Sequence, residues 1–186
     1  MAEIDTIGVV ELSSVARGFV VQDAMLKAAA VELLMARTIC SGKYIVAVSG
    51  DAASVAASVD AGATAGTGAV IEKRRITRVH PSIFPAILGN VYLDAGQAGA
   101  LGVIETFSAS SILEVADAAV KTADVTLFRV HLAMALGGKG FVLLTGDVAS
   151  VTAAVEAGAR VAGEDGILVD RAVIAAPSRE LFREFV

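Results

Sequence analysis

An internal repeat is the feature of this sequence that most constrains its fold. The segment Ile7 to Gly50 reads IGVVELSSVARGFVVQDAMLKAAAVELLMARTICSGKYIVAVSG, and Leu101 to Gly146 reads LGVIETFSASSILEVADAAVKTADVTLFRVHLAMALGGKGFVLLTG. A period this long that occurs only twice argues against a solenoid, which needs three or more stacked units. The chain of 186 residues is therefore predicted to form two similar domains, at 1–92 and 97–186.

The two copies differ visibly at one place, which contains the only cysteine. The second copy follows the first at an offset of about 94 residues up to Cys40 and of about 96 residues beyond Gly42. The change indicates a short insertion at 134–137, opposite the cysteine. The second offset continues through GDAASVAASVDAGA and GDVASVTAAVEAGA, and it pairs Arg75 with Arg171. A position that was not duplicated is where we look for chemistry.

Each copy predicts the element order β-α-β-β-α-β, which is an α+β, ferredoxin-like arrangement with helices on one face of an antiparallel sheet. In the first copy, the hydrophobic pattern and the turn residues predict strands at 7–12, 31–39, 44–49 and 69–77 and a helix at 19–30. Cys40, Ser41 and Gly42 form the predicted hairpin tip. Asp51 is a good N-cap for the alanine-rich helix that follows, and Asp23 and Lys27 form an i,i+4 pair.

Composition excludes several classes of protein. The net charge of −5 and the pI near 5.0 argue against nucleic acid as a partner. The mean hydropathy is high, at +0.71, but charged residues interrupt every apolar run before it reaches the length of a membrane helix, so we expect no membrane partner. The start MAEIDT lacks the pattern of a signal peptide, and one cysteine excludes an intramolecular disulfide. We expect a cytosolic protein whose excess apolar surface is covered by oligomer contacts.

A search for catalytic motifs indicates that the chain is not an enzyme. The pairs Gly42-Lys43 and Gly138-Lys139 lack the upstream glycine of a P-loop. Glu11 and Glu105 lie at equivalent strand ends, where hydrogen bonding is a better explanation than acid–base chemistry. His80 and His131 have no neighbours at metal-ligand spacing, and the basic cluster at 73–78 is best explained as a solvated rim.

The repeated unit resembles the bacterial microcompartment shell domain. The resemblance lies in the strands GVVEL and GVIET, the helices DAMLKAA and DAAVKTAD, the hairpins GKYIVAVSGD and GKGFVLLTGD, and the proline late in each copy. Two such domains in tandem resemble the T-type shell proteins, most closely those of propanediol-utilisation microcompartments, through RTICSGKY, VHPSIFPAI and RVHLAMALGGKG. The resemblance implies a homotrimer that imitates a hexamer and lies with other shell proteins in a microcompartment shell within the cytoplasm.

The resemblance also implies roles for particular residues. In this family a lysine late in the first helix lies at the edge of the disc and helps discs to tile, and the matching positions are Lys27 and Lys121. The hairpin tip of the first domain lines a central pore, which assigns Ser41 and Gly42 to the pore lining. The cysteine at the matching position ligates a [4Fe-4S] cluster, so Cys40 becomes the expected cofactor and metal ligand.

Symmetry makes a cluster compatible with one cysteine per chain, because three chains place three thiolates around one axis and a cubane normally has four ligands. Zinc, with three sulfur ligands and a water, is the main competing metal, and a buried cysteine with no metal is the structural alternative. The expected function is a shell protein that passes electrons across the shell to or from a redox enzyme. The alternatives are a shell protein whose pore passes a small metabolite, and a ferredoxin-like regulator that binds a small ligand.

Overall fold

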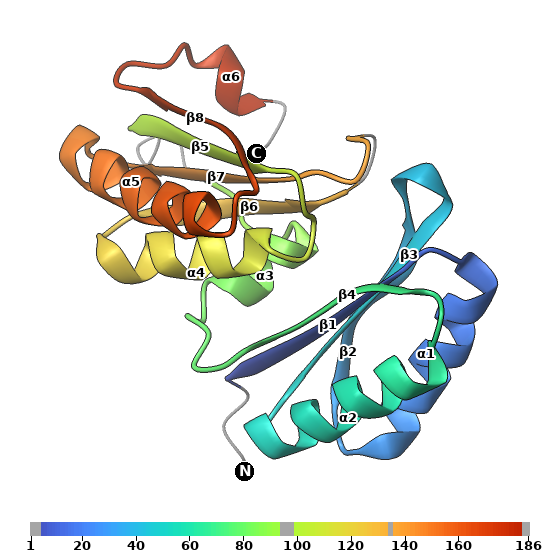
Figure 1. Ribbon diagram of the computed structural model, residues 1–186. Coiled ribbons are helices and arrows are strands. Elements are labelled where there is room, and N and C mark those ends of the chain that lie inside the picture. Colours follow the sequence, from blue (N-terminus) through green and yellow to red (C-terminus); the bar gives the residue numbers. More distant parts are fainter. Residues whose placement is uncertain (1–4, 94–98, 134–135, 184–186) are drawn as a thin grey trace. The chain divides into compact units, whose positions relative to one another are not determined.

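The first of two compact units contains one sheet and two helices (Figure 1). The computed structural model describes residues 5–93, 99–133 and 136–183, and the chain divides after Val79. The elements of the first unit are β1 (Thr6–Leu12), α1 (Val15–Ala28), β2 (Glu32–Ile39), the 3-10 turn η1 (Cys40–Gly42), β3 (Lys43–Gly50), α2 (Ala52–Ala65) and β4 (Val70–Ile76). The strands are hydrogen-bonded in the order β2-β3-β1-β4, and every pair is antiparallel.

The second unit repeats this arrangement with the order β6-β7-β5-β8, which confirms the predicted pair of β-α-β-β-α-β domains. Its elements are α3 (Ile83–Leu88), β5 (Ala100–Thr106), α4 (Ile112–Thr122), β6 (Thr126–Leu132), β7 (Gly140–Gly146), α5 (Val148–Glu164), β8 (Leu168–Ile174) and α6 (Glu180–Arg183). The prediction had assigned residues 80–92 to the first domain. In the structure α3 packs on β6 of the second unit, and the second unit begins at His80.

The core of the first unit lies between the sheet and its two helices. Its buried members are Val10, Leu12, Val21, Met25, Tyr44, Val46, Val48, Val55 and Val59. Both helices begin at polar caps. Asp51 accepts hydrogen bonds from the backbone of Ala53 and Ser54, as predicted. The first helix begins earlier than the predicted Phe19, at Val15, because the Ser14 side chain accepts a hydrogen bond from the Arg17 backbone.

In the second unit both faces of the sheet are covered. Alternate residues of β5 point to opposite faces: Ile104 lies against Gly158 of α5, whereas Leu101 belongs to a cluster that includes Phe128 and Phe182. The ring centroids of Phe128 and Phe182 are 6.0 Å apart, so the short helix α6 covers the face of the sheet opposite α5. This cluster adds hydrophobic burial to a sheet that α4 and α5 cover on the other side.

The strand register corrects one match made from the sequence. β1 pairs with β4 so that Glu11 lies opposite Glu72, and β5 pairs with β8 so that Glu105 lies opposite Asp170. By this register the counterpart of Arg171 is Lys73, which is two residues before the predicted Arg75. The extra length lies before β8, where α5 has 17 residues and α2 has 14.

Candidate functional site

The tip of the first hairpin is a short and exposed turn that carries Cys40. Cys40 opens η1 and is half-buried, while Ser41 and Gly42 are exposed. Ser41 and Gly42 have φ values of 67° and 71°, in the left-handed region that glycine adopts easily and serine adopts at a cost. The predicted hairpin with its glycine is therefore confirmed, and the thiol lies at the edge of a solvent-exposed turn.

The second hairpin has a longer connection and no cysteine. β6 ends at Leu132 and β7 begins at Gly140, whereas three residues connect β2 and β3. The predicted counterpart of Cys40, Met134, lies outside the described residues. On either side of it, Ala133 and Gly137 have φ values of 54° and 63°. The two hairpins have equivalent strands, but the segments that connect the strands differ in length.

A lysine follows each tip and pairs with a glutamate on the neighbouring strand. Lys43 Nζ lies 2.9 Å from Glu11 Oε1, and Lys139 Nζ lies 3.0 Å from Glu105 Oε1. The Glu11 side chain is 3% exposed, whereas that of Glu105 is 30% exposed. Both glutamates are therefore structural acceptors, as expected. The sequence does not indicate these lysine partners, because each lysine lies more than 30 residues from its glutamate.

Cys40 is the only cysteine in the sequence, so each chain can offer one thiolate ligand. Within the described residues, no group of three His, Cys, Asp or Glu side chains could hold a metal ion. His80 Nδ1 lies 2.8 Å from the Ser82 hydroxyl, and the ring of His131 stacks on Phe141 with centroids 4.8 Å apart. A metal bound through Cys40 would require further ligands, which other copies of the chain could supply. Cys40 is half-buried beside two exposed residues, and a cysteine sulfur suits iron–sulfur clusters and zinc.

The two lysines expected at a disc edge occupy equivalent helices but have different surroundings. Lys27 Nζ is 2.7 Å from Asp23 Oδ2, as the i,i+4 spacing predicted, and the two side chains are 75% and 62% exposed. Lys121 Nζ is 2.5 Å from Asp117 Oδ2, and these side chains are 41% and 11% exposed. Asp117 also accepts a hydrogen bond from the His80 backbone at 2.8 Å. Lys27 thus has the weaker and more accessible ion pair.

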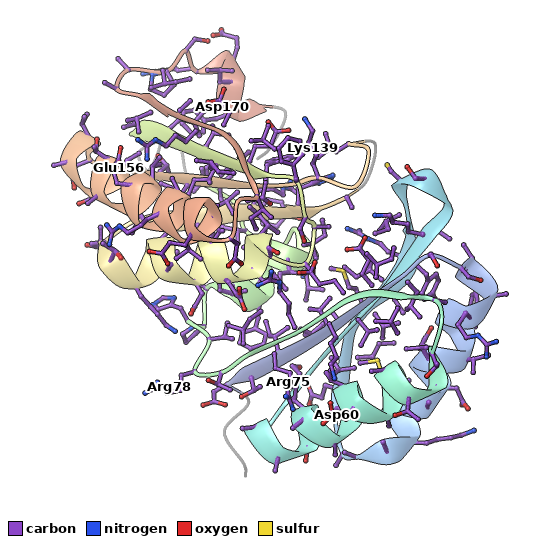
Figure 2. All side chains as sticks on the ribbon, viewed as in Figure 1. Asp60, Arg75, Arg78, Lys139, Glu156 and Asp170 are labelled. Atoms are coloured by element: carbon purple, nitrogen blue, oxygen red, sulfur yellow. The ribbon has the colours of Figure 1, made fainter. Side chains whose placement is uncertain are left out.

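Acidic side chains partly neutralise the basic cluster on β4. Asp60 on α2 forms ion pairs with Lys73 at 3.2 Å and with Arg75 at 3.5 Å. Figure 2 shows Asp60 and Arg75 on the same side of the first unit. The equivalent pair in the second unit joins Glu156 and Arg171 at 2.8 Å. The cluster is therefore a solvent-exposed network of ion pairs on an edge strand, and such charges also discourage edge-to-edge strand pairing.

The repeated fold and a match to a known domain family define the class of protein. The model of the BMC domain family matches residues 6–79 and 100–177, with one match in each unit. The chain therefore belongs to the BMC domain family and is a bacterial microcompartment shell protein. This finding confirms the resemblance noted in the sequence, and it favours a shell protein over a small-ligand regulator.

Individual relatives extend this assignment over nearly all of the chain. The chain is 39% identical over 180 residues to the bacterial microcompartment shell protein PduT of Citrobacter freundii, covering 97% of each protein. It is 41% identical over 86 residues to the shell protein EutM of Salmonella typhimurium, covering 46% of this chain and 88% of EutM. A crystal structure of a microcompartments protein from Desulfitobacterium hafniense DCB superposes with a TM-score of 0.92 at 47% identity, covering 97% of this chain and 99% of that one.

These relatives confirm two further expectations from the sequence. They are named as shell proteins and not as enzymes, which agrees with the lack of a catalytic motif in the sequence. The shell of a bacterial microcompartment is also the predicted location. Among the described residues, no helix is both long enough and apolar enough to span a membrane.

Proposed function

We propose that three copies of this chain assemble about a three-fold axis into a disc of six similar domains, and that such discs tile the shell. The two units share one strand order, so six units from three chains can take nearly equivalent positions. Large apolar side chains also remain exposed on α1, where Phe19 is 61% and Val20 is 48% exposed. Contact with other chains would remove this surface from water. Neighbouring shell proteins are the expected partners, with Lys27 and Lys121 at the disc edge.

Within this assembly, Cys40 is proposed to ligate a [4Fe-4S] cluster on the three-fold axis. The observation that carries the proposal is the half-buried Cys40 at the exposed tip of one hairpin, in a segment where the two copies differ in length and only the first has a cysteine. Three chains would supply three thiolates, and the fourth iron would remain available to water or to another ligand. When bound, the cluster would accept and donate single electrons, so that it could connect redox proteins on the two sides of the shell.

Two other uses of the same tip compete with this proposal. Three thiolates and a water would also suit zinc, which has no redox chemistry. In the second competing function, the tips would line a pore through which a small metabolite passes, with Ser41 and Gly42 in the lining and Cys40 without a metal. The exposure of Ser41 and Gly42 is compatible with this use.

The test is anaerobic reconstitution of the native protein and of Cys40→Ser, followed by iron and sulfide analysis, zinc analysis and electron paramagnetic resonance. The cluster predicts about four irons per three chains and a reducible signal that is lost in the variant. Equal iron content in the two proteins would contradict ligation by Cys40, and zinc without sulfide would assign the site to zinc. Size measurement on both proteins serves as the control, because the serine variant should still assemble. A protein that assembles without any metal would leave the pore as the function of the tip.

A further inference from the structure

The two residues that follow Cys40 at the tip make little contact with the rest of the unit. A Cβ atom added to Gly42 would meet no atom within 4 Å, and both Ser41 and Gly42 are exposed. The residues that flank the turn therefore contribute to fixing its position. Ile39, before the cysteine, is 5% exposed, and the two residues after the turn are Lys43 and Tyr44. Because neighbouring residues of a strand point to opposite faces, these two can contact different parts of the unit.

Lys43 attaches the end of the tip to β1 on one face of the sheet. Its ammonium group lies 2.9 Å from the carboxylate of Glu11, which is almost completely buried. Lys43 is 28% exposed, but loss of Lys43 would leave the buried carboxylate of Glu11 without compensation, which costs more than the loss of a fully exposed pair. The pair therefore opposes movement of the first residue of β3 away from β1.

Tyr44 attaches the same strand to α1 on the other face. A Cβ atom at Gly18 would lie 2.4 Å from Cγ and Cδ1 of the Tyr44 ring, so the ring occupies the space that only a glycine leaves open. The ring centroid is 5.2 Å from that of Phe19, and the hydroxyl donates a hydrogen bond to Gln22 Oε1 at 3.0 Å. Burial raises the pKa of Tyr44, which keeps the hydroxyl protonated as a donor.

The second hairpin retains only one of these two attachments. Lys139 pairs with Glu105, but both side chains are about one-third exposed, at 36% and 30%. Gly140 follows Lys139 at the position equivalent to Tyr44, so no side chain extends from this residue to α4. Instead Ile112, the counterpart of Gly18, fills the space, with its Cβ 2.9 Å from where a Cβ of Gly140 would lie. The double attachment belongs to the hairpin that carries the cysteine.

We propose that Lys43 and Tyr44 are positioning residues that hold the Cys40 thiol in place for a metal centre shared between chains. This inference rests on the proposed function, because a shared centre needs each chain to present its thiolate in the same geometry. A protein site binds its metal tightly when the residues that support the metal ligands are themselves fixed by packing and hydrogen bonds. Here Glu11, Gly18 and Gln22 supply that support from two elements, β1 and α1.

The first test is the alkylation rate of Cys40 by iodoacetamide in the metal-free protein, measured between about pH 6 and pH 9.5 around the ordinary thiol pKa. We expect the plateau rate at high pH to rise about fivefold in Lys43→Met. A fivefold change corresponds to a loss of about 1 kcal/mol from the free energy that holds the thiol in its native position. The matched control Lys139→Met removes the equivalent lysine from the other unit and should leave the rate unchanged. Lys43→Arg should restore most of the native rate, because it retains the charge.

A second variant keeps the inference testable if Lys43→Met does not fold. Tyr44→Phe retains the ring over Gly18 and removes only the hydrogen bond to Gln22, so its plateau rate should rise by a smaller factor. Equal plateau rates in the native protein, Tyr44→Phe, Lys43→Met and Lys139→Met would overturn the inference. Equal rates in Tyr44→Phe and the native protein would also overturn it if Lys43→Met is unfolded. Circular dichroism and size measurement identify variants that have lost the fold.

A separate measurement distinguishes failure of this inference from failure of the proposed function. Iron content after reconstitution should fall in Lys43→Met and remain at the native level in Lys139→Met. If the native protein itself binds no iron, the proposed cluster fails, while the alkylation rates still decide whether Lys43 and Tyr44 fix the thiol. If the alkylation rates differ as expected but the reconstituted variants bind iron like the native protein, the positioning role is rejected.

Discussion

The contact between the first helix and the third strand is built in opposite ways in the two units. In the first unit the helix contributes Gly18 and the strand contributes Tyr44, whereas in the second unit the helix contributes Ile112 and the strand contributes Gly140. Each contact thus combines one large residue with one glycine, but the large residue comes from different elements. The comparison shows that a duplicated core can keep its packing while it moves a side chain from helix to strand. Only the first unit has an aromatic residue, Tyr44, at this position of the strand that follows the hairpin tip.

The largest expected effect comes from breaking this contact in the first unit. Gly18→Ile introduces a side chain into space that the Tyr44 ring occupies, and overpacking of this kind should lower the free energy of unfolding by about 3 kcal/mol. Chemical denaturation followed by circular dichroism, at one fixed protein concentration, measures the change.

The double variant Gly18→Ile with Tyr44→Gly reproduces the arrangement of the second unit and serves as the control. Its loss of stability should be smaller than the sum of the two single losses, by about 1–3 kcal/mol. Additive losses would mean that Gly18 and Tyr44 do not form a matched pair, and the comparison between the units would lose its basis.

An intermediate effect is expected from the two lysines of the equivalent helices. Lys121→Ala leaves the mostly buried Asp117 with only its hydrogen bond from His80, which should lower the free energy of unfolding by about 1 kcal/mol. Lys27→Ala removes an exposed pair and should cost less than about 0.5 kcal/mol. If the two lysines tile discs as proposed, electron microscopy should show that Lys27→Ala loses extended sheets although it retains its stability. Equal stability losses in the two variants would show that the burial of Asp117 has no energetic consequence.

The smallest effect concerns a feature that the two units share. Hydrogen bonds from the Ser54 side chain and backbone lower the pKa of Asp51 from 3.8, and Ser150 does the same for Asp147. A lowered pKa in the folded state means that these caps stabilise above about pH 3.8 and lose their contribution as the pH falls through the folded-state value. Asp51→Asn and Asp147→Asn should therefore flatten the dependence of the melting temperature on pH between about 2 and 5 to a similar and small extent. A clear difference between the two variants would show that the caps are not equivalent.

The repeat predicted most of the fold because its landmarks are local. The Asp51 cap, the Asp23–Lys27 pair and the glycine at the hairpin tip each depend on residues a few positions apart, and the structure contains all three. Family resemblance then supplied the class of protein, which the matches in both units confirm. The roles of Cys40 and of the edge lysines remain predictions.

Features that depend on contacts between distant segments could not be predicted in the same way. The match of Arg75 with Arg171 was wrong because the small residues at the ends of α2 and α5 contain no landmark that marks the longer helix. The partnership of Gly18 with Tyr44 joins a helix to a strand across the core, and neither residue carries a motif. Likewise, the burial of Glu11 compared with Glu105 is not visible in two nearly identical strands.

The fusion of both units into one chain also fixes the ratio of the two kinds of hairpin tip in every assembly that the chain forms. If the units were separate proteins, random mixing would produce rings with every number of cysteine-bearing tips, and few of them would have the same set of ligands. Because each chain contains one tip of each kind, every assembly of this protein has equal numbers of the two. The ratio is thus set by translation and does not depend on the relative expression of two genes.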